Sequence, residues 1–321
     1  MTQRKYTSEL CVNMLCSQPV LIQPHNLGHP SFLEYAVEMP FHIYMICRRP
    51  RITFETDSLA YQGRNVMGEF IVHEKGKRVS VPFTVEMPMD PPLMVFKCDY
   101  PHSDVKILDE NGRVVIEIHA SHLMCNVSAG LHDMSQMKHL DLEVLYVGQA
   151  YGKDGERTAP DRLKNHETLL EVYQHLSSAA PLDEVWIALL HFEDPFFIIS
   201  FDGRDKSTTV TGDEDAAHFN NVIDNPVSER QRICFAEAAI IRHFQPQYNN
   251  NFKYNFPNPA HGTYASCYEL DLNAVAVEVQ FEELFTRMYS HAQPPVHTSY
   301  IKFPLHDTSD RKSMFDFGFS S

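Results

Sequence analysis

The chain has 321 residues, of which 27 are Lys or Arg and 42 are Asp or Glu, giving a formal net charge of −15 at pH 7. Such an acidic balance opposes non-specific attraction to nucleic acid and leaves room only for a locally basic site. No apolar run is long enough for a transmembrane helix, and we expect no signal peptide. The cysteines are scattered and never spaced Cys-x-x-Cys, which argues against a zinc finger or a disulfide framework and indicates a reducing cytoplasm.

The first part of the chain predicts an all-β domain, a sandwich or barrel, over residues 1–125. Residues 1 to about 40 are expected to be irregular because prolines interrupt them. Gly76 and Gly112 supply the positive φ that two hairpin turns need. The expected strands are short alternating segments at 41–47, 51–55, 68–73, 78–85, 93–97, 105–108 and 113–119.

From about residue 126 the pattern changes to strands alternating with helices, which predicts an α/β unit over 126–255 and an α+β class for the whole chain. A polar stretch at 202–227 is expected to be a surface loop or insertion. Strands are expected at 142–148, 184–192 and 195–201, and helices at 159–178 and 228–244.

The C-terminal part, 256–321, returns to strand-like alternation at 268–279 and 298–303. It is therefore expected to be a β-containing extension. The last dozen residues are expected to form a mobile tail.

The stretch 145–166 runs from a buried strand through a glycine-rich loop to a helix start. Its glycines suggest a phosphate-binding loop, but the run from Gly148 to Lys153 is one residue short of the Walker pattern. Asp154 stands where that pattern needs a hydroxyl, and its charge would repel phosphate. These departures argue against a nucleotide-binding loop.

The helix start that follows carries a candidate anion site. Thr158, Pro160 and Asp161 predict the helix N-terminus. Arg162 and His166 then lie at i and i+4 near its positive end, where a guanidinium and an imidazole suit an anion. The alternative is structural: Arg162 pairs with a carboxylate and His166 bonds a backbone carbonyl. The neighbouring apolar face is expected to contain Leu163, Leu170, Tyr173 and Leu176.

The second helix begins with a predicted capping box of Ser228 and Gln231. Glu237 lies inside its apolar stripe, and a carboxylate on a buried helix face is costly unless it is paired or coordinated. Glu237 either binds a divalent cation through oxygen or accepts a hydrogen bond from Arg or Tyr without catalytic meaning. The other residues of the stripe are Ile233, Ile240 and Phe244.

Together these pieces resemble the GIY-YIG nuclease superfamily over residues 126–255. The resemblance rests on Tyr146-Val147-Gly148, on the helix that carries Arg162 and His166, on the helical Glu237, and on the segment from Pro246 to Asn249. It implies a small antiparallel sheet flanked by helices and a site that hydrolyses phosphodiester bonds.

The resemblance also implies roles for individual residues. Tyr146 would lie beside the attacking water and the scissile phosphate, Arg162 would stabilise charge on the phosphate, and His166 would assist proton transfer or hold substrate. Glu237 would hold Mg²⁺ or Mn²⁺, and Asn249 would order the site. Further substrate contacts would come from Gly148, Lys153, Arg157 and Lys164.

The first half of the motif, Gly-[Ile/Val]-Tyr, is missing upstream of Tyr146. The nearest candidate is Gly130-Leu131-His132, with a histidine in place of the tyrosine that is usually proposed to be the general base or its relay. His132 suits that role because imidazole titrates near neutrality. Tyr151, in the loop, is the other candidate substitute.

Two hypotheses follow. The first is a divalent-metal-dependent endonuclease acting on nucleic acid, DNA rather than RNA, in a restriction, mobile-element or phage-defence role. Its N-terminal β domain would recognise the target, form a homo-oligomer or bind a protein partner. The second is a binding or assembly module in which the same fold is catalytically degenerate. Neither involves a membrane, and the expected compartment is the cytoplasm.

Overall fold

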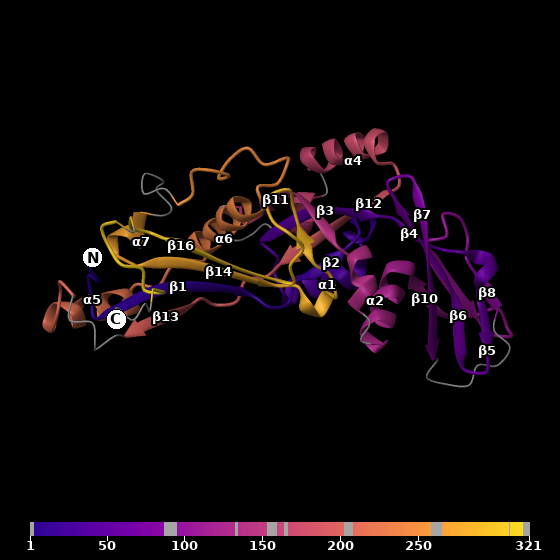
Figure 1. The fold of residues 1–321 in the computed structure, drawn as a ribbon, viewed down its shortest axis with the longest axis horizontal. Coiled ribbons are helices and arrows are strands. Elements are labelled where there is room, and N and C mark those ends of the chain that lie inside the picture. Colours follow the sequence, from indigo (N-terminus) through magenta and orange to yellow (C-terminus); the bar gives the residue numbers. More distant parts are fainter. Residues whose placement is uncertain are drawn as a thin grey trace.

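The computed structural model describes residues 3–86, 95–131, 134–152, 159–163, 166–201, 208–257, 265–307 and 309–316. It has the expected α+β class, with several sheets and helices packed against them. Figure 1 shows an elongated molecule with both chain ends at one end and a β-rich unit at the other.

The central sheet has the strand order β15-β11-β3-β12-β2. Its middle strand, β3, is antiparallel to both β11 and β12. The run from Phe41 to Cys47 is buried almost completely, because both faces of the sheet are covered, and its sequence is correspondingly apolar. The strands are β2 (Val20–Ile22), β3 (Ile43–Pro50), β11 (Leu142–Gln149), β12 (Asp183–Leu190) and β15 (Met288–Tyr289).

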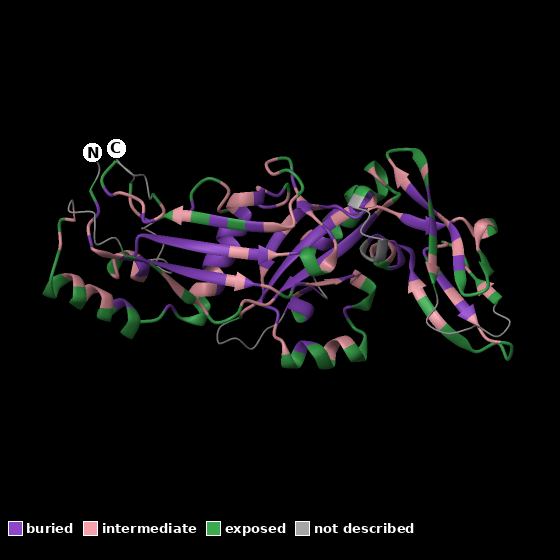
Figure 2. Cartoon of the chain, turned by 60° about the horizontal axis from the view of Figure 1, so that its bottom comes forward, coloured by how far each residue is buried: buried purple, intermediate pink, exposed green. Residues whose placement is uncertain are grey.

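A second sheet has the order β13-β1-β14-β16, and β1 lies between an antiparallel and a parallel neighbour. Figure 2 shows that the strands of these two sheets are mostly buried, whereas much of the β-rich unit is exposed or half-buried. The strands are β1 (Ser8–Cys16), β13 (Phe196–Phe201), β14 (Ala274–Gln280) and β16 (Thr298–Pro304).

The expectation of an irregular N-terminus is wrong. Besides β1 and β2, this region contains η1 (Pro24–Asn26) and α1 (Pro30–Glu38). Strand β1 shows no alternation because it is covered on both faces. Pro30 occupies the first turn of α1, where proline favours a helix start.

Helix α6 (Glu229–Phe244) contacts strands of both sheets and lies in the largest apolar core. Its start has the capping box predicted for Ser228 and Gln231. Its buried residues lie on several sides, as expected for a helix that is covered nearly all round. The predicted stripe with Glu237 inside it is therefore buried as a whole.

The opposite face of the central sheet is covered by α1, α3 (Ala159–Leu163) and α4 (Glu167–Ala179). The helix expected over 159–178 is thus two helices, and His166 is the N-cap of the second. The restart changes which face of α4 is buried. Leu170 and Tyr173, expected to be covered, are 61% and 43% exposed. Leu169 and Val172 are buried in their place, whereas Leu163 and Leu176 are buried as expected.

The β-rich unit has two sheets around one core. Helix α2 (Ala120–Leu131) contributes residues to this core, and η3 (Met134–His139) follows α2 in the chain. Gly76 and Gly112 have positive φ in its hairpin turns, as predicted. One sheet contains β4 (Ile52–Phe54), β5 (Ala60–Gln62), β6 (Asn65–Glu74) and β7 (Lys77–Glu86), with η2 (Thr56–Ser58) between β4 and β5. The other contains β8 (Val95–Lys97), β9 (Asp104–Leu108) and β10 (Val114–His119).

The expected domain division, with a boundary near residue 125, differs from this organisation. Strands β1, β2 and β3 pair with strands from residues 126–321, so they do not belong to the β-rich unit. The unit begins after β3, ends before β11, and contains α2, so it is an insertion between two neighbouring strands rather than an all-β N-terminal domain (Figure 1). The segments 41–47 and 51–55 alternate alike in sequence although they join different sheets.

Two further expectations are corrected in the second half of the chain. The stretch 202–227 contains α5 (Asp213–Asp224), whose Asp215 accepts hydrogen bonds from the backbone of Thr7 and Ser8; residues 202–207 lie outside the described ones. The extension contains strands, as expected, and also α7 (Ala265–Glu269) and η4 (Glu282–Leu284). Its described end is packed, since Arg311 and Met314 are 6% and 1% exposed.

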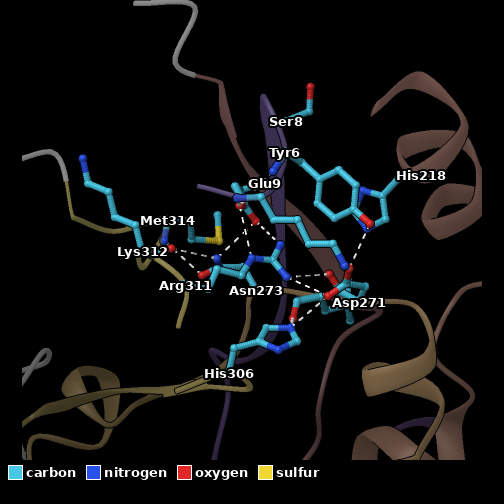
Figure 3. Close-up of polar contacts among 12 residues, drawn as sticks. Tyr6, Ser8, Glu9, His218, Asp271, Asn273, His306, Arg311, Lys312 and Met314 are labelled. Atoms are coloured by element: carbon cyan, nitrogen blue, oxygen red, sulfur yellow. Dashed lines mark hydrogen bonds and ion pairs between the residues drawn. The ribbon is translucent and has the colours of Figure 1, made fainter. Parts of the chain in front are cut away.

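The two chain ends are joined by a buried charge cluster, drawn in Figure 3. Arg311 pairs with the fully buried Glu9 and, at 2.7 Å, with Asp271. Asp271 also pairs with His306 at 3.1 Å, and Asn273 donates to Glu9 at 3.1 Å. Buried charges need such complete pairing, because one left alone is strongly destabilising.

Candidate functional site

Two tyrosines from neighbouring strands form the centre of the site. Tyr44 of β3 and Tyr146 of β11 have ring centroids 6.1 Å apart. The strand register places Gly148 opposite Tyr44, and a Cβ atom on Gly148 would lie 2.6 Å from the Tyr44 hydroxyl and 2.7 Å from the Tyr146 ring. Glycine is required at 148 because any larger residue would displace both rings.

His166 hydrogen-bonds the first of these tyrosines. Its Nε2 lies 2.7 Å from the Tyr44 hydroxyl oxygen, and its Nδ1 accepts from the backbone N–H of Leu169 at 3.3 Å. In the neutral ring an accepting Nδ1 leaves the proton on Nε2. His166 therefore donates to Tyr44 while it caps α4.

Arg162 approaches the same oxygen from α3. Its Nε donates to the Tyr44 hydroxyl at 3.2 Å. Burial opposes the charge of Arg162, but the hydrogen bond to Tyr44 and nearby acidic groups outweigh it and raise the Arg162 pKa. The Tyr44 oxygen thus accepts from two donors that belong to two different helices.

Burial governs the protonation of the two tyrosines. It is the main cause that raises the pKa of both hydroxyls. The neighbouring Tyr146 raises the pKa of Tyr44 further, whereas Arg162 opposes the rise at both hydroxyls. Both phenols are therefore neutral, and the Tyr44 hydroxyl that accepts from His166 and Arg162 lies beside Tyr146.

Glu237 lies on the buried face of α6, where it interacts electrostatically with Arg162. Burial raises its pKa to about 7, against the opposing effects of Arg162 and of hydrogen bonds from Gln149 at the end of β11. Among the described residues, no group of three or more His, Cys, Asp or Glu side chains is arranged to hold a metal ion. Any cation here would depend on one carboxylate and water, a ligand set that Mg²⁺ accepts.

Asn249 holds the strand that carries Tyr146 and Gly148. Its Oδ1 accepts from the backbone N–H of Val147 at 2.9 Å, and its Nδ2 donates to the Val147 carbonyl at 2.8 Å. The neighbouring strand β15 pairs with β11 only at Leu142 and Glu143, so the amide of Asn249 continues the ladder where β15 ends.

A cavity of about 300 Å³ opens beside these residues. Arg162 and Arg230, the latter in the first turn of α6, both line it, together with Tyr151 and Cys234. Two guanidinium groups, one of them in the first turn of a long helix, make the cavity suited to an anion. The remaining predicted contacts and the predicted cap, namely His132, Lys153, Arg157, Thr158 and Lys164, lie outside the described residues.

Tyr44 is the site residue that sequence reasoning missed. The whole β-rich unit separates it from Tyr146 in the chain, so no residue near Tyr146 in the sequence points to it. The signal was present, since His42-Ile43-Tyr44 differs from Gly-[Ile/Val]-Tyr only at its first residue. Tyr151, the substitute suggested from the sequence, instead hydrogen-bonds Glu229 at 3.1 Å.

Comparisons of the chain with protein-family models, curated proteins and solved structures find no match. In the described part of the chain, no helix has the length and apolar character needed to cross a membrane.

Proposed function

We propose that the protein is a divalent-metal-dependent endonuclease of the GIY-YIG type, with DNA rather than RNA as its substrate. The observation that carries the proposal is the convergence of Arg162 and His166 on the hydroxyl oxygen of Tyr44. This tyrosine completes a motif that the sequence left half matched, and it does so through strand pairing rather than proximity in the chain.

In this proposal each side chain has a separate role in the hydrolysis of a phosphodiester bond. Arg162, with Arg230 beside it, stabilises the negative charge that grows on the phosphate. Tyr146, beside Tyr44, contacts the attacking water or a phosphate oxygen, and the hydrogen-bonded pair of Tyr44 and His166 assists the transfer of the proton that the water loses. Asn249 keeps β11 in register during the reaction.

Glu237 fits the metal that such a reaction uses. Mg²⁺ and Mn²⁺ are oxygen-seeking cations, and Mg²⁺ is commonly held by one or two carboxylates with water filling the other positions. When bound there, a divalent cation supplies charge stabilisation to the leaving oxygen. The restriction, mobile-element or phage-defence role and the cytoplasmic location belong to the same proposal, with target recognition assigned to the inserted β-rich unit.

The test is nicking of supercoiled plasmid, and in parallel of structured RNA, with Mg²⁺ or Mn²⁺. Glu237→Gln and Arg162→Ala are each expected to lower the rate by about 10²-fold or more. Glu184→Gln is the matched control, because Glu184 is another buried glutamate, 7% exposed, outside the site. If folded wild-type protein shows no metal-dependent cleavage of any nucleic acid, the proposal is wrong and the module is non-enzymatic.

A further inference from the structure

A second cavity, of about 290 Å³, adjoins the candidate site. Tyr151 lines the first cavity, while its ring packs edge-on against His42 and its hydroxyl donates to Glu229. His42 and Glu229 both line the second cavity. The adjacent residues Glu229 and Arg230 thus line different cavities, and Tyr151 separates the two cavities.

The two cavities differ in hydrogen-bonding character. The first presents the guanidinium donors of Arg162 and Arg230, whereas most polar groups that line the second are acceptors. His191 donates its Nδ1 proton to the Pro40 carbonyl at 2.8 Å, which leaves a lone pair on Nε2 of the neutral ring. The nitrogen Nε2 of His42 lies 3.9 Å from a Glu229 carboxylate oxygen, beyond a direct hydrogen bond.

His42 has a buried ring nitrogen that makes no hydrogen bond to the described residues. It is only 8% exposed, and its Nδ1 finds no hydrogen-bond partner among the described residues. A buried polar atom without a partner carries a desolvation penalty that a bound ligand can relieve. The nearby carboxylate of Glu229 favours the proton on Nε2, so Nδ1 is left as an acceptor.

The other walls of the second cavity are apolar. Leu190 and Ile233 are buried, and Phe192 is half-buried beside them. Arg232 also lines the cavity. Its Nη1 pairs with Asp194 at 2.9 Å, and its buried Nε, which has no hydrogen-bond partner among the described residues, adds a donor to the acceptors. Apolar walls with a few acceptors suit a flat heterocycle that bears amino groups.

We infer that this second cavity binds the nucleobase next to the scissile phosphate and selects adenine, cytosine or guanine over thymine and uracil. The inference rests on the proposed function, which places the phosphate between Arg162 and Arg230. Adenine, cytosine and guanine carry an exocyclic amino group with two N–H donors for these acceptors, whereas thymine and uracil offer a single N3–H between two carbonyl oxygens. A base in such a cavity has left its stack, so the substrate strand is single or locally opened there.

The test uses fluorescein-labelled single-stranded oligonucleotides of adenine, cytosine or thymine. Their dissociation constants are measured on the Glu237→Gln protein, and their kcat/KM values on the wild type with Mg²⁺. The adenine and cytosine strands are expected to bind, and to be cut, about tenfold better than the thymine strand. Equal values for all three strands would overturn the inference.

Glu229→Gln sharpens the test, because it replaces an acceptor oxygen by an amide donor. The ratio of adenine to thymine affinity is expected to fall by about tenfold, since the amide N–H pairs with the thymine carbonyl. Glu283→Gln, an exposed glutamate on η4, is the matched control and retains the wild-type ratio. An unchanged ratio in Glu229→Gln and in His191→Phe overturns the inference, and the second variant decides it if the first does not fold.

The outcomes separate this inference from the proposed function. Base-dependent binding without metal-dependent cleavage supports base selection by the second cavity and overturns the nuclease proposal. Metal-dependent cleavage without base dependence supports the nuclease proposal and overturns base selection by this cavity. The absence of both binding and cleavage overturns both.

Discussion

The imidazole of His166 and the hydroxyl of Tyr44 are hydrogen-bonded at 2.7 Å although 122 positions separate them in the chain. Arg162 donates to the same oxygen at 3.2 Å, so one phenol joins a strand to two helices. This contact makes Tyr44 the most informative position to change.

Tyr44→Phe is expected to lower metal-dependent cleavage by about 10²-fold while leaving the fold intact. The ring that packs in the core stays, but the hydroxyl that accepts from His166 and Arg162 is lost. Plasmid nicking rates and thermal unfolding measured together check this. Tyr6→Phe is the control, because it also removes a buried hydroxyl, one that donates to Asp271. Equal activity in Tyr44→Phe and the wild type would contradict the assigned role.

Gly148→Ala is expected to lower both stability and cleavage. Its new Cβ would lie within 2.7 Å of both tyrosines, and relieving such overpacking costs about 1–3 kcal/mol. Denaturant unfolding measures the first effect and plasmid nicking the second. Gly28→Ala is the matched control, since nothing lies within 4 Å of a Cβ there. Equal effects of the two substitutions would show that the close approach to Tyr44 is unimportant.

The candidate site was predictable in part. Tyr146, Arg162, His166 and Glu237 follow one another within a continuous segment, so their order and helical spacing can be recognised from the sequence. Tyr44 could not be predicted from the sequence, because the pairing between β3 and β11 is a non-local contact across the inserted unit. A short alternating segment such as 41–47 indicates a strand but does not say which sheet it joins.

Asn249→Ala is expected to destabilise the protein by about 1–3 kcal/mol and to weaken cleavage. It leaves the backbone N–H and carbonyl of Val147 without their side-chain partners, and buried polar groups left unpaired cost about that much. Denaturant unfolding checks the stability term. Asn225→Ala, at an exposed helix end where the amide bonds Asn221, is expected to change stability by less than half as much.

The buried cluster at the chain ends predicts an acid-dependent stability. Burial alone would raise the pKa of Asp271, but hydrogen bonds from His306 and Lys5 and the charge of Arg311 outweigh burial and lower it. The folded pKa therefore lies below the unfolded value of about 3.9. This carboxylate contributes stability above about pH 4, and the contribution is lost as pH falls from there through the folded pKa.

The Asp271→Asn protein should accordingly be less stable than the wild type at neutral pH, but it should lose less stability as the pH falls below about 4. Unfolding by urea at a series of pH values measures the slope of the free energy of unfolding against pH. Asp310→Asn, an exposed aspartate on the same segment, should keep the wild-type slope. A slope in Asp271→Asn equal to that of the wild type would contradict the predicted role of the cluster.

The fold was predictable where local patterns are strong. Helix α6 and its capping box, the hairpin turns at Gly76 and Gly112, and most strand positions follow from periodicity and turn residues. Strand β1 and the break before α4 were not, for opposite physical reasons. A strand covered on both faces has no alternation, and a helix that restarts at a histidine cap resembles an unbroken one in sequence.

The position of β1 between β13 and β14 has a consequence for biosynthesis. The first strand leaves the ribosome with both hydrogen-bonding edges unpaired, and its second neighbour, β14, begins only at Ala274. Synthesis as far as β14 must therefore precede closure of this sheet. Nascent chains that stop earlier expose an apolar strand with at least one unpaired edge, which makes them substrates for chaperones and proteases.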